Sequence, residues 1–193
     1  MKSIILSCTP FECEKIVNGN ISILVRKKVP NETPFKVYVC CASRQTDAAL
    51  FIEKETKKAH HIDNYRKAWA FDGYHITCFL ANGKVIGEFI CNKVDEYPYD
   101  YCDGVDIDDD TILETAIERE DINIYAKGKP LYGLHISDLK IYDEPQALSC
   151  FYKQCPKNTT CSTCDWFHVD WHTFGECSNT ITRPPKNYIY VEE

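Results

Sequence analysis

The chain has 193 residues, of which 44% are hydrophobic and 26% charged, a composition typical of one globular domain. Its formal net charge of −7 argues against a broad basic face for non-specific nucleic-acid binding, but it leaves room for a small basic pocket. No apolar run approaches the length of a membrane span, and the run at residues 4–6 is too short for a signal peptide. We therefore expect a cytoplasmic protein.

The first part of the chain predicts a strand, a helix and a second strand. Residues 3–7 are apolar and predict the first strand. The stretch Thr9-Pro10-Phe11-Glu12 fits a capping box with proline at the first helical position, so we expect a helix over residues 10–18. Gly19 is a natural left-handed end for that helix. Residues 21–27 predict the second strand.

Residues 36–42 (KVYVCCA) predict a third strand, and their nearly continuous apolar run indicates burial on both faces. Residues 43–75 are interpreted as an insertion with a hairpin around Glu55-Thr56-Lys57. Asn82-Gly83 is the preferred two-residue turn, and it predicts a hairpin between residues 76–80 and 84–93. Glu88 lies in the middle of the second strand of that hairpin.

The acidic residues are concentrated in residues 95–121, which we interpret as a solvated loop followed by a helix over residues 111–120. The alternative is a surface for a basic partner or a mimic of nucleic acid. Further strands are predicted at residues 132–142 and 187–191. Five or six strands with two or three short helices predict a single α+β domain over residues 1–193, built around a curved sheet or a small barrel.

A cluster of cysteines lies in residues 150–180, the predicted zinc-binding segment. Cys161 and Cys164 have the spacing of a zinc knuckle, and Cys155 and Cys177 can complete a tetrahedral set of four thiolates. Such a closed site has no open position for substrate, so the Zn²⁺ would be structural. A disulfide or redox pair and free buried thiols are the alternatives, and Cys150, His168 or His172 could replace one of the four ligands. The other cysteines lie mostly in apolar strands and are interpreted as small buried hydrophobes.

Together these pieces resemble an ASCH domain of the PUA-like superfamily, and in particular the phage and prophage type. The resemblance rests on SCTPFECEKIVNG (residues 7–19), PFKVYVCCAS (34–43), GKVIGEFIC (83–91), YGLHISDLKIYDEPQALS (132–149), the cysteine spacing and ITRPPKNYIYVEE (181–193). It implies a PUA-like barrel with short flanking helices, a cleft beside the first helix, and a cytoplasmic location in a bacterial or phage-infected host cell. Some family members are implied to bind RNA, and others to hydrolyse acetylated cytidine or to cleave RNA.

The family hallmark is glycine, any residue, lysine, threonine or serine, any residue, glutamate, any residue, arginine. Gly19, Ser22 and Arg26 match it, whereas Ile21 and Leu24 stand at the lysine and glutamate positions. A desolvated lysine can act as a base or nucleophile, which isoleucine cannot do. The resemblance therefore favours binding over catalysis, and an enzymatic activity is not expected.

The candidate ligand-binding residues are Ser22, Arg26, Glu88, His135 and Tyr188. Arg26 would contact a phosphate or a base edge, although it could also be a solvent-facing strand end. Glu88 would be either a second catalytic candidate beside Ser22 or half of a structural ion pair with Arg26. His135 could instead be a hydrogen-bonded core histidine, and Tyr188 could stack on a flat ligand or only pack.

Three functions follow from these observations. The first is a module that binds a nucleotide, a nucleoside or short RNA in a cleft near Ser22 and Arg26. The second is a weak amidohydrolase or ribonuclease-like hydrolase of modified nucleosides or RNA that uses Ser22 and Glu88. The third is a phage interaction protein that inhibits a host nucleic-acid-directed enzyme through its acidic surface.

Overall fold

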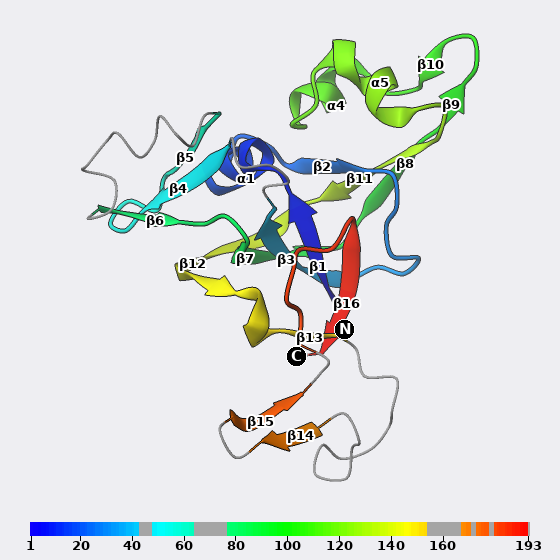
Figure 1. Cartoon of the computed structure of the whole chain (residues 1–193). Helices are drawn as coiled ribbons and strands as arrows, with labels where there is room; N and C mark the ends of the chain where they lie inside the picture. Colours follow the sequence, from blue (N-terminus) through cyan, green and yellow to red (C-terminus); the bar gives the residue numbers. More distant parts are fainter. Residues whose placement is uncertain (43–47, 64–76, 154–166, 171–172, 178–179, 193) are drawn as a thin grey trace.

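A six-stranded sheet forms the centre of the computed structural model, which describes residues 1–42, 48–63, 77–153, 167–170, 173–177 and 180–192 (Figure 1). The strand order is β12-β7-β3-β1-β16-β13. In chain order these strands are β1 (Lys2–Cys8), β3 (Phe35–Cys41), β7 (Lys84–Cys91), β12 (Ser137–Ala147), β13 (Tyr152–Lys153) and β16 (Tyr188–Glu192). The β1–β3 pair is parallel, and the other neighbours are antiparallel.

Two three-stranded sheets flank this centre, with orders β2-β11-β8 and β5-β4-β6. Their strands are β2 (Ile23–Arg26), β4 (Ala49–Glu53), β5 (Ala59–Ile62), β6 (Cys78–Leu80), β8 (Val94–Tyr97) and β11 (Leu131–His135). Two short pairs complete the strands: β9 (Tyr99–Asp100) with β10 (Gly104–Val105), and β14 (Phe167–Asp170) with β15 (Thr173–Cys177).

The helices of the described residues are short: α1 (Pro10–Val17), α4 (Asp109–Leu113), α5 (Ile122–Ala126) and the 3-10 turns η1 (Arg119–Asp121) and η2 (Leu148–Cys150). The chain is therefore a mixed α+β protein made mostly of strands, as the sequence predicts. Among the described strands, the pairings give open sheets and do not close a barrel. Within the same residues, no helix has both the length and the apolar character needed to cross a membrane.

Helix α1 has the predicted ends. The Thr9 hydroxyl accepts a hydrogen bond from the backbone N–H of Glu12, and the Glu12 carboxylate accepts one from the Thr9 N–H, which completes the capping box. After the helix, Gly19 has φ of +69°, the left-handed conformation expected of a helix-ending glycine. Cys13 and Ile16 point from α1 into the main core.

The main core lies between one face of the six-stranded sheet and the elements that cover that face. Leu6, Val39 and Phe89 of the sheet meet α1, while Leu50 of β4 and Leu24 of β2 close the sides. Apolar residues alternate along β1, so that Ile4 and Leu6 face this core and Ile5 faces the other side. The opposite face is covered by the segment around η2, through Leu148 and Phe151.

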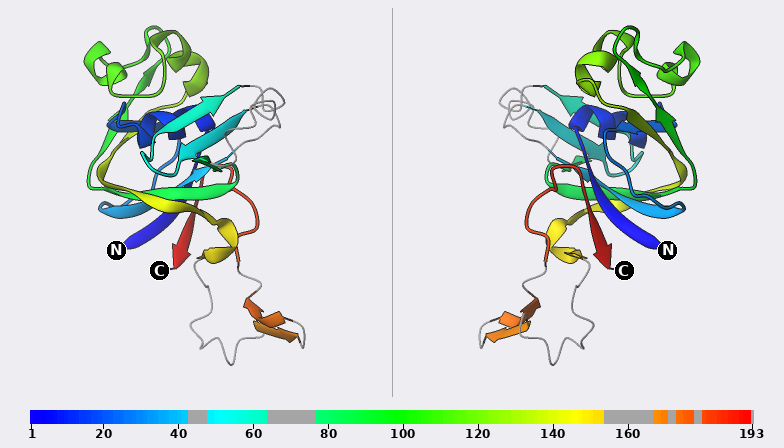
Figure 2. Two further views of the ribbon diagram at one scale, coloured as in Figure 1. Left: turned by 90° about the vertical axis from the view of Figure 1, so that its left-hand side faces the viewer. Right: turned by 90° about the vertical axis from the view of Figure 1, so that its right-hand side faces the viewer.

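Residues 94–126, from β8 to α5, form a small lobe with its own core. This core contains Val105, Ile112 and Ile122, and it also takes Ile23 and Val25 from β2. Because Leu24 faces the main core, β2 is buried on both sides, which explains its fully apolar interior. The small lobe and the β14–β15 hairpin lie at opposite ends of the molecule (Figure 2).

The acidic stretch forms most of the small lobe and is more ordered than the predicted loop and helix. Asp108 caps α4 by accepting hydrogen bonds from the backbone N–H and the hydroxyl of Thr111, and these bonds hold the pKa of Asp108 below its usual value. Helix α4 ends at Leu113, and after the 3-10 turn η1 a separate helix α5 follows. The single predicted helix over residues 111–120 is therefore wrong.

The hairpin predicted at Asn82-Gly83 is also wrong, whereas the one around Glu55-Thr56-Lys57 is confirmed by the pairing of β4 with β5. Strands β6 and β7 flank Asn82-Gly83 but belong to different sheets. The Asn82 side chain binds the backbone of Ala48 and Leu50, and the Gly83 N–H donates to the Cys41 carbonyl. Asn82 and Gly83 therefore connect two different sheets and do not close a hairpin.

The strand predicted at residues 132–142 is two strands, β11 and β12, separated by Ile136. The Ile136 N–H donates to the Ser22 carbonyl, and two residues later Asp138 adopts φ of +51°. At this kink the chain leaves the β2-β11-β8 sheet and enters the central sheet. The alternation of apolar residues predicts a strand, but it does not show where the chain passes from one sheet to another.

Candidate functional site

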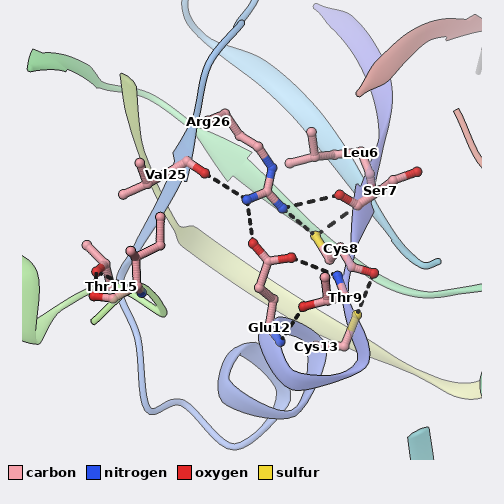
Figure 3. A network of polar contacts seen from close by, with 10 residues as sticks. Leu6, Ser7, Cys8, Thr9, Glu12, Cys13, Val25, Arg26 and Thr115 are labelled. Carbon is pink, nitrogen blue, oxygen red and sulfur yellow. Dashed lines mark hydrogen bonds and ion pairs between the residues drawn. The ribbon is translucent and has the colours of Figure 1, made fainter. Parts of the chain in front are cut away.

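Arg26 is the last residue of β2 and is only 8% exposed, so it is not the solvent-facing strand end considered above. It lies on the same side of β2 as Leu24 and points toward the start of α1 (Figure 3). Nη1 donates to Glu12 Oε1 at 2.6 Å and to the Val25 carbonyl at 2.7 Å. Nη2 donates to the Ser7 carbonyl and to Cys8 Sγ, both at 3.2 Å.

Glu12 joins this guanidinium to the helix cap. One of its carboxylate oxygens accepts from Arg26, and the other accepts from the Thr9 N–H at 2.7 Å. The two side chains of the ion pair are 9% and 16% exposed, so water screens the pair weakly. Burial lowers the pKa of Arg26, but the attraction of Glu12, together with smaller effects of Cys8 and Tyr125, outweighs it and raises that pKa above its usual value. The arginine is therefore permanently charged.

Buried thiols lie beneath this ion pair. The Cys8 sulfur contacts Arg26, and Cys13 Sγ lies 3.9 Å from the Cys8 carbonyl. Burial raises the pKa of the Cys13 thiol well above its usual value, and it raises the pKa of Cys40 to about 12. Cys8, Cys13, Cys40, Cys41, Cys78 and Cys91 are buried, as predicted for small hydrophobes, while Cys102 and Cys150 are exposed.

A pocket of about 570 Å³, here called pocket A, opens above Arg26. It lies where the start of α1, the end of β2, β5 and α5 meet. Its volume is in the range of small-molecule sites. The lining residues that matter for a ligand are Phe11, Arg26, Lys27, His61, Tyr125 and Lys186. Since Arg26 is paired with Glu12, the lysines supply the cationic groups beyond that pair, and Asp63 supplies an opposing carboxylate.

Aromatic rings give pocket A flat apolar walls. Lys27 Nζ lies 5.0 Å from the centre of the Tyr125 ring, and the Phe11 ring meets His61 edge-on at 5.3 Å. His61 is held by a hydrogen bond from its ring to Glu14. Burial raises the pKa of Tyr125, although the charge of Arg26 opposes this shift. A cationic pocket with flat aromatic walls suits an anionic ligand that carries a planar ring.

A second pocket of about 650 Å³, here called pocket B, lies beside pocket A. Its lining includes Lys27, Lys28, Asn31, Glu96, Tyr132 and Tyr188. The Tyr188 hydroxyl donates to the Val29 carbonyl at 3.2 Å, and its ring meets Tyr190 edge-on. The structure thus places Tyr188 at the wall of a pocket, while it also packs against the main core.

Glu88 does not pair with Arg26, so the predicted ion pair is wrong. Its carboxylate accepts a hydrogen bond from the Tyr142 hydroxyl at 2.7 Å. Burial raises the pKa of that tyrosine, and the contact with Glu88 raises it further. Glu88 lies opposite Tyr38 in the register of β3 and β7, and Tyr38 belongs to the core on the sheet face away from α1. The sheet therefore separates Glu88 from Arg26.

Ser22 and His135 lie near each other in the structure. Neither of them lines pocket A or pocket B. Ser22 precedes β2, and its hydroxyl donates to the carboxylate of Glu114 at the end of α4. His135 ends β11, and its Nε2 lies 2.6 Å from Asp95. Burial raises the pKa of Asp95, but hydrogen bonds from His135 and Lys93 outweigh it and hold that pKa below its usual value. Of the five predicted ligand-binding residues, Arg26 lines pocket A and Tyr188 lines pocket B.

Three of the predicted zinc ligands, Cys155, Cys161 and Cys164, lie outside the described residues, as does His172. The backbone of Cys177 pairs with Phe167 in the β14–β15 hairpin, which also contains His168. Cys150 is exposed at the end of η2. Among the residues that the structure describes, no group of three histidine, cysteine or acidic side chains could hold a metal ion.

Lys27, Tyr125 and Lys186 line pocket A but are not among the site residues predicted from the sequence. Lys27 directly follows Arg26, and Lys186 lies two residues before Tyr188, but no motif in the sequence marks either lysine. Glu12 was correctly assigned to the helix cap, while its second contact with Arg26 depends on the packing of α1 against β2. No sequence signal marked Tyr125, because its place in pocket A depends on how the small lobe folds back.

Comparison with known proteins gives distant structural similarity alone. No protein-family model and no curated protein matches the sequence. The crystal structure of an ASCH protein from Zymomonas mobilis has 12% identity and a TM-score of 0.46 over 76% of this chain and 74% of that one. A Tyr-to-Phe variant of it has 12% identity and a TM-score of 0.47 over 77% of each chain. These similarities are weak, so the assignment of the chain to a family is a proposal.

Proposed function

We propose that the chain is a phage-type ASCH module with a PUA-like fold, and that it binds a nucleotide or a nucleotide unit of short RNA in pocket A. The supporting observation is the composition of pocket A: Lys27 and Lys186 line it beside aromatic rings, above a buried arginine. The lysines would hold the phosphate, and Tyr125 would contact the base. The net charge of −7 favours such a confined site over a broad RNA groove.

Arg26 has a positioning role in this proposal. Its Nη1 and Nη2 atoms already donate to Glu12, Val25, Ser7 and Cys8, so a ligand would have to compete with these contacts. Its charge is compensated by the Glu12 carboxylate, which also lines pocket A, so Arg26 holds the start of α1 against β2 while the lysines supply the positive charge. The Ile21 and Leu24 side chains are buried, so neither hallmark position offers an acid or base to the ligand.

The lysines provide the direct test of this site. We expect Lys27→Ala and Lys186→Ala each to weaken the binding of the four nucleoside 5′-monophosphates by about tenfold, because each change removes a charge-assisted hydrogen bond to phosphate worth roughly 1.4 kcal/mol. Titration calorimetry at low salt measures the dissociation constants. Lys2→Ala is the matched control, since Lys2 is exposed at the other end of β1 and pairs with Glu32.

Two results would contradict the nucleotide site. One is the absence of binding by any nucleoside monophosphate to the unaltered protein. The other is that Lys27→Ala, Lys186→Ala and Lys2→Ala bind the nucleoside monophosphates with equal affinity, which would place the ligand elsewhere.

The hydrolase hypothesis receives no support from the arrangement of its residues. Ser22 contacts Glu114 of the small lobe, and Glu88 contacts Tyr142 on the central sheet. Neither of them lines pocket A or pocket B. A nucleophile and its base must lie within hydrogen-bond reach to act together, and these two side chains have other partners.

We also propose that Cys155, Cys161, Cys164 and Cys177 bind one structural Zn²⁺. Four thiolates are a donor set that suits tetrahedral zinc, and a metal would hold together an irregular segment that we expect to have little core of its own. We expect elemental analysis of the purified protein to give about one zinc per chain.

Cys161→Ser should lose this zinc, whereas Cys102→Ser, which changes an exposed cysteine of the small lobe, should retain it. A metal-free protein whose thiols all react with a thiol reagent would refute the zinc site.

A further inference from the structure

Pockets A and B are joined by two segments of the chain. Lys27 lines both pockets, with Arg26 on the side of pocket A and Lys28 on the side of pocket B. In the same way Lys186 lines pocket A, and Tyr188 lines pocket B. The two pockets therefore adjoin each other, with Lys27 at their boundary.

Positive charge is concentrated around this junction in a chain whose net charge is −7. Lys27, Lys28 and Lys186 line the pockets. Lys127 and Lys129, which follow α5, lie near enough to Lys27 to lower its pKa, an effect that adds to the larger effect of burial. Like charges repel one another, so such a group of lysines gains stability when a polyanion neutralises it.

Each pocket also offers tyrosine rings. Tyr125 lies in pocket A, and Tyr132 and Tyr188 lie in pocket B. The hydroxyl of Tyr188 is fixed by the Val29 carbonyl, which limits the rotation of its ring. Stacking on such rings is a sequence-tolerant way to hold unpaired bases, because every base has a flat face.

We propose that pockets A and B bind two consecutive nucleotides of a single-stranded oligonucleotide, with the connecting phosphate at Lys27. This inference rests on the proposed function of pocket A and extends it to a chain-like ligand. One base would lie in pocket A beside Tyr125. The next would lie in pocket B beside Tyr132 or Tyr188, with Lys28 near its phosphate. A base-paired duplex fits this arrangement poorly, because its bases are already stacked on each other and face inward.

The test compares ligands of different length on the unaltered protein. Fluorescence anisotropy with labelled single-stranded RNA and DNA tetranucleotides, and calorimetry with nucleoside 5′-monophosphates, give the dissociation constants. We expect the tetranucleotides to bind at least tenfold more tightly than any monophosphate, and a duplex of the same sequence to bind no more tightly than a monophosphate. Comparing the dissociation constants of the RNA and DNA tetranucleotides shows whether the 2′-hydroxyl contributes to binding.

Variants of pocket B separate the two sites. Lys28 is exposed, so Lys28→Ala should fold normally. It should weaken tetranucleotide binding about fivefold and leave monophosphate binding unchanged. Lys2→Ala, which changes an exposed lysine outside both pockets, serves again as the surface control.

The outcomes distinguish this inference from the proposed function. Tight monophosphate binding without any gain for the tetranucleotides would overturn the two-nucleotide inference and leave pocket A intact. Equal loss of both ligands in Lys28→Ala would also overturn it, as would a duplex that binds as tightly as the single strand. Failure of both ligand classes to bind would refute the proposed function itself.

Discussion

Replacing Glu12 by alanine is expected to lower the free energy of unfolding by about 3–5 kcal/mol, the usual cost of removing one partner of a buried ion pair. The change leaves the Arg26 guanidinium charged and buried without its carboxylate. It also removes the acceptor of the Thr9 N–H at the start of α1. Urea unfolding followed by circular dichroism at neutral pH measures the loss.

Two further variants resolve the origin of this effect. Thr9→Ala removes the hydroxyl cap alone and should cost about 1 kcal/mol. Glu12→Gln keeps an acceptor for the helix cap but removes the negative charge, so its loss should fall between the other two. If Glu12→Ala proves no more destabilising than Thr9→Ala, the ion pair does not stabilise the fold as described.

Gly87→Ala is expected to cost about 1–3 kcal/mol or more, the range for inserting atoms into a packed site. Gly87 lies in the middle of β7, where an added Cβ would collide with the backbone carbonyl oxygen of Lys140 and would lie 3.1 Å from the Cα of Ile141. Both neighbours belong to β12, so the collision can be relieved only by separating two paired strands. Thermal or urea unfolding would show the loss.

Gly133→Ala is the comparison for this prediction. Its added Cβ would meet the side chains of Tyr97 and Ile23, which can move, instead of backbone atoms. We therefore expect Gly133→Ala to be less destabilising than Gly87→Ala. The reverse order would indicate that β12 adjusts more readily than the core of the small lobe.

Local signals predicted much of the fold correctly. The capping box at Thr9 and the left-handed Gly19 define both ends of α1, because helix ends depend on a few neighbouring residues. Strands β1, β3 and β16 were also recognised from their apolar composition. The errors arose where tertiary contacts decide the outcome, as at Asn82, whose side chain bonds to the backbone at Ala48 and Leu50.

The site was less predictable than the fold. Arg26 could be singled out from its hallmark position, but its partner Glu12 lies in another element and was assigned to the helix cap alone. Glu88 was a reasonable partner by charge, yet strand parity places it on the opposite sheet face. The pockets themselves depend on how α1, the small lobe and β16 converge, and a linear pattern does not encode that convergence.

The position of β1 between β3 and β16 has a consequence for folding kinetics. β1 pairs with β16 from Ser3↔Val191 to Leu6↔Tyr188, so the central sheet joins residues near the two ends of the described chain. Such non-local pairing must overcome a large loop-closure entropy, which slows folding compared with proteins rich in local contacts. During synthesis the edge of β1 that receives β16 stays unpaired until residue 191 has emerged, and unpaired strand edges are sites of aggregation. Lys186 and Tyr188 lie beside or in β16, so each pocket needs a residue that is synthesised after the rest of its lining.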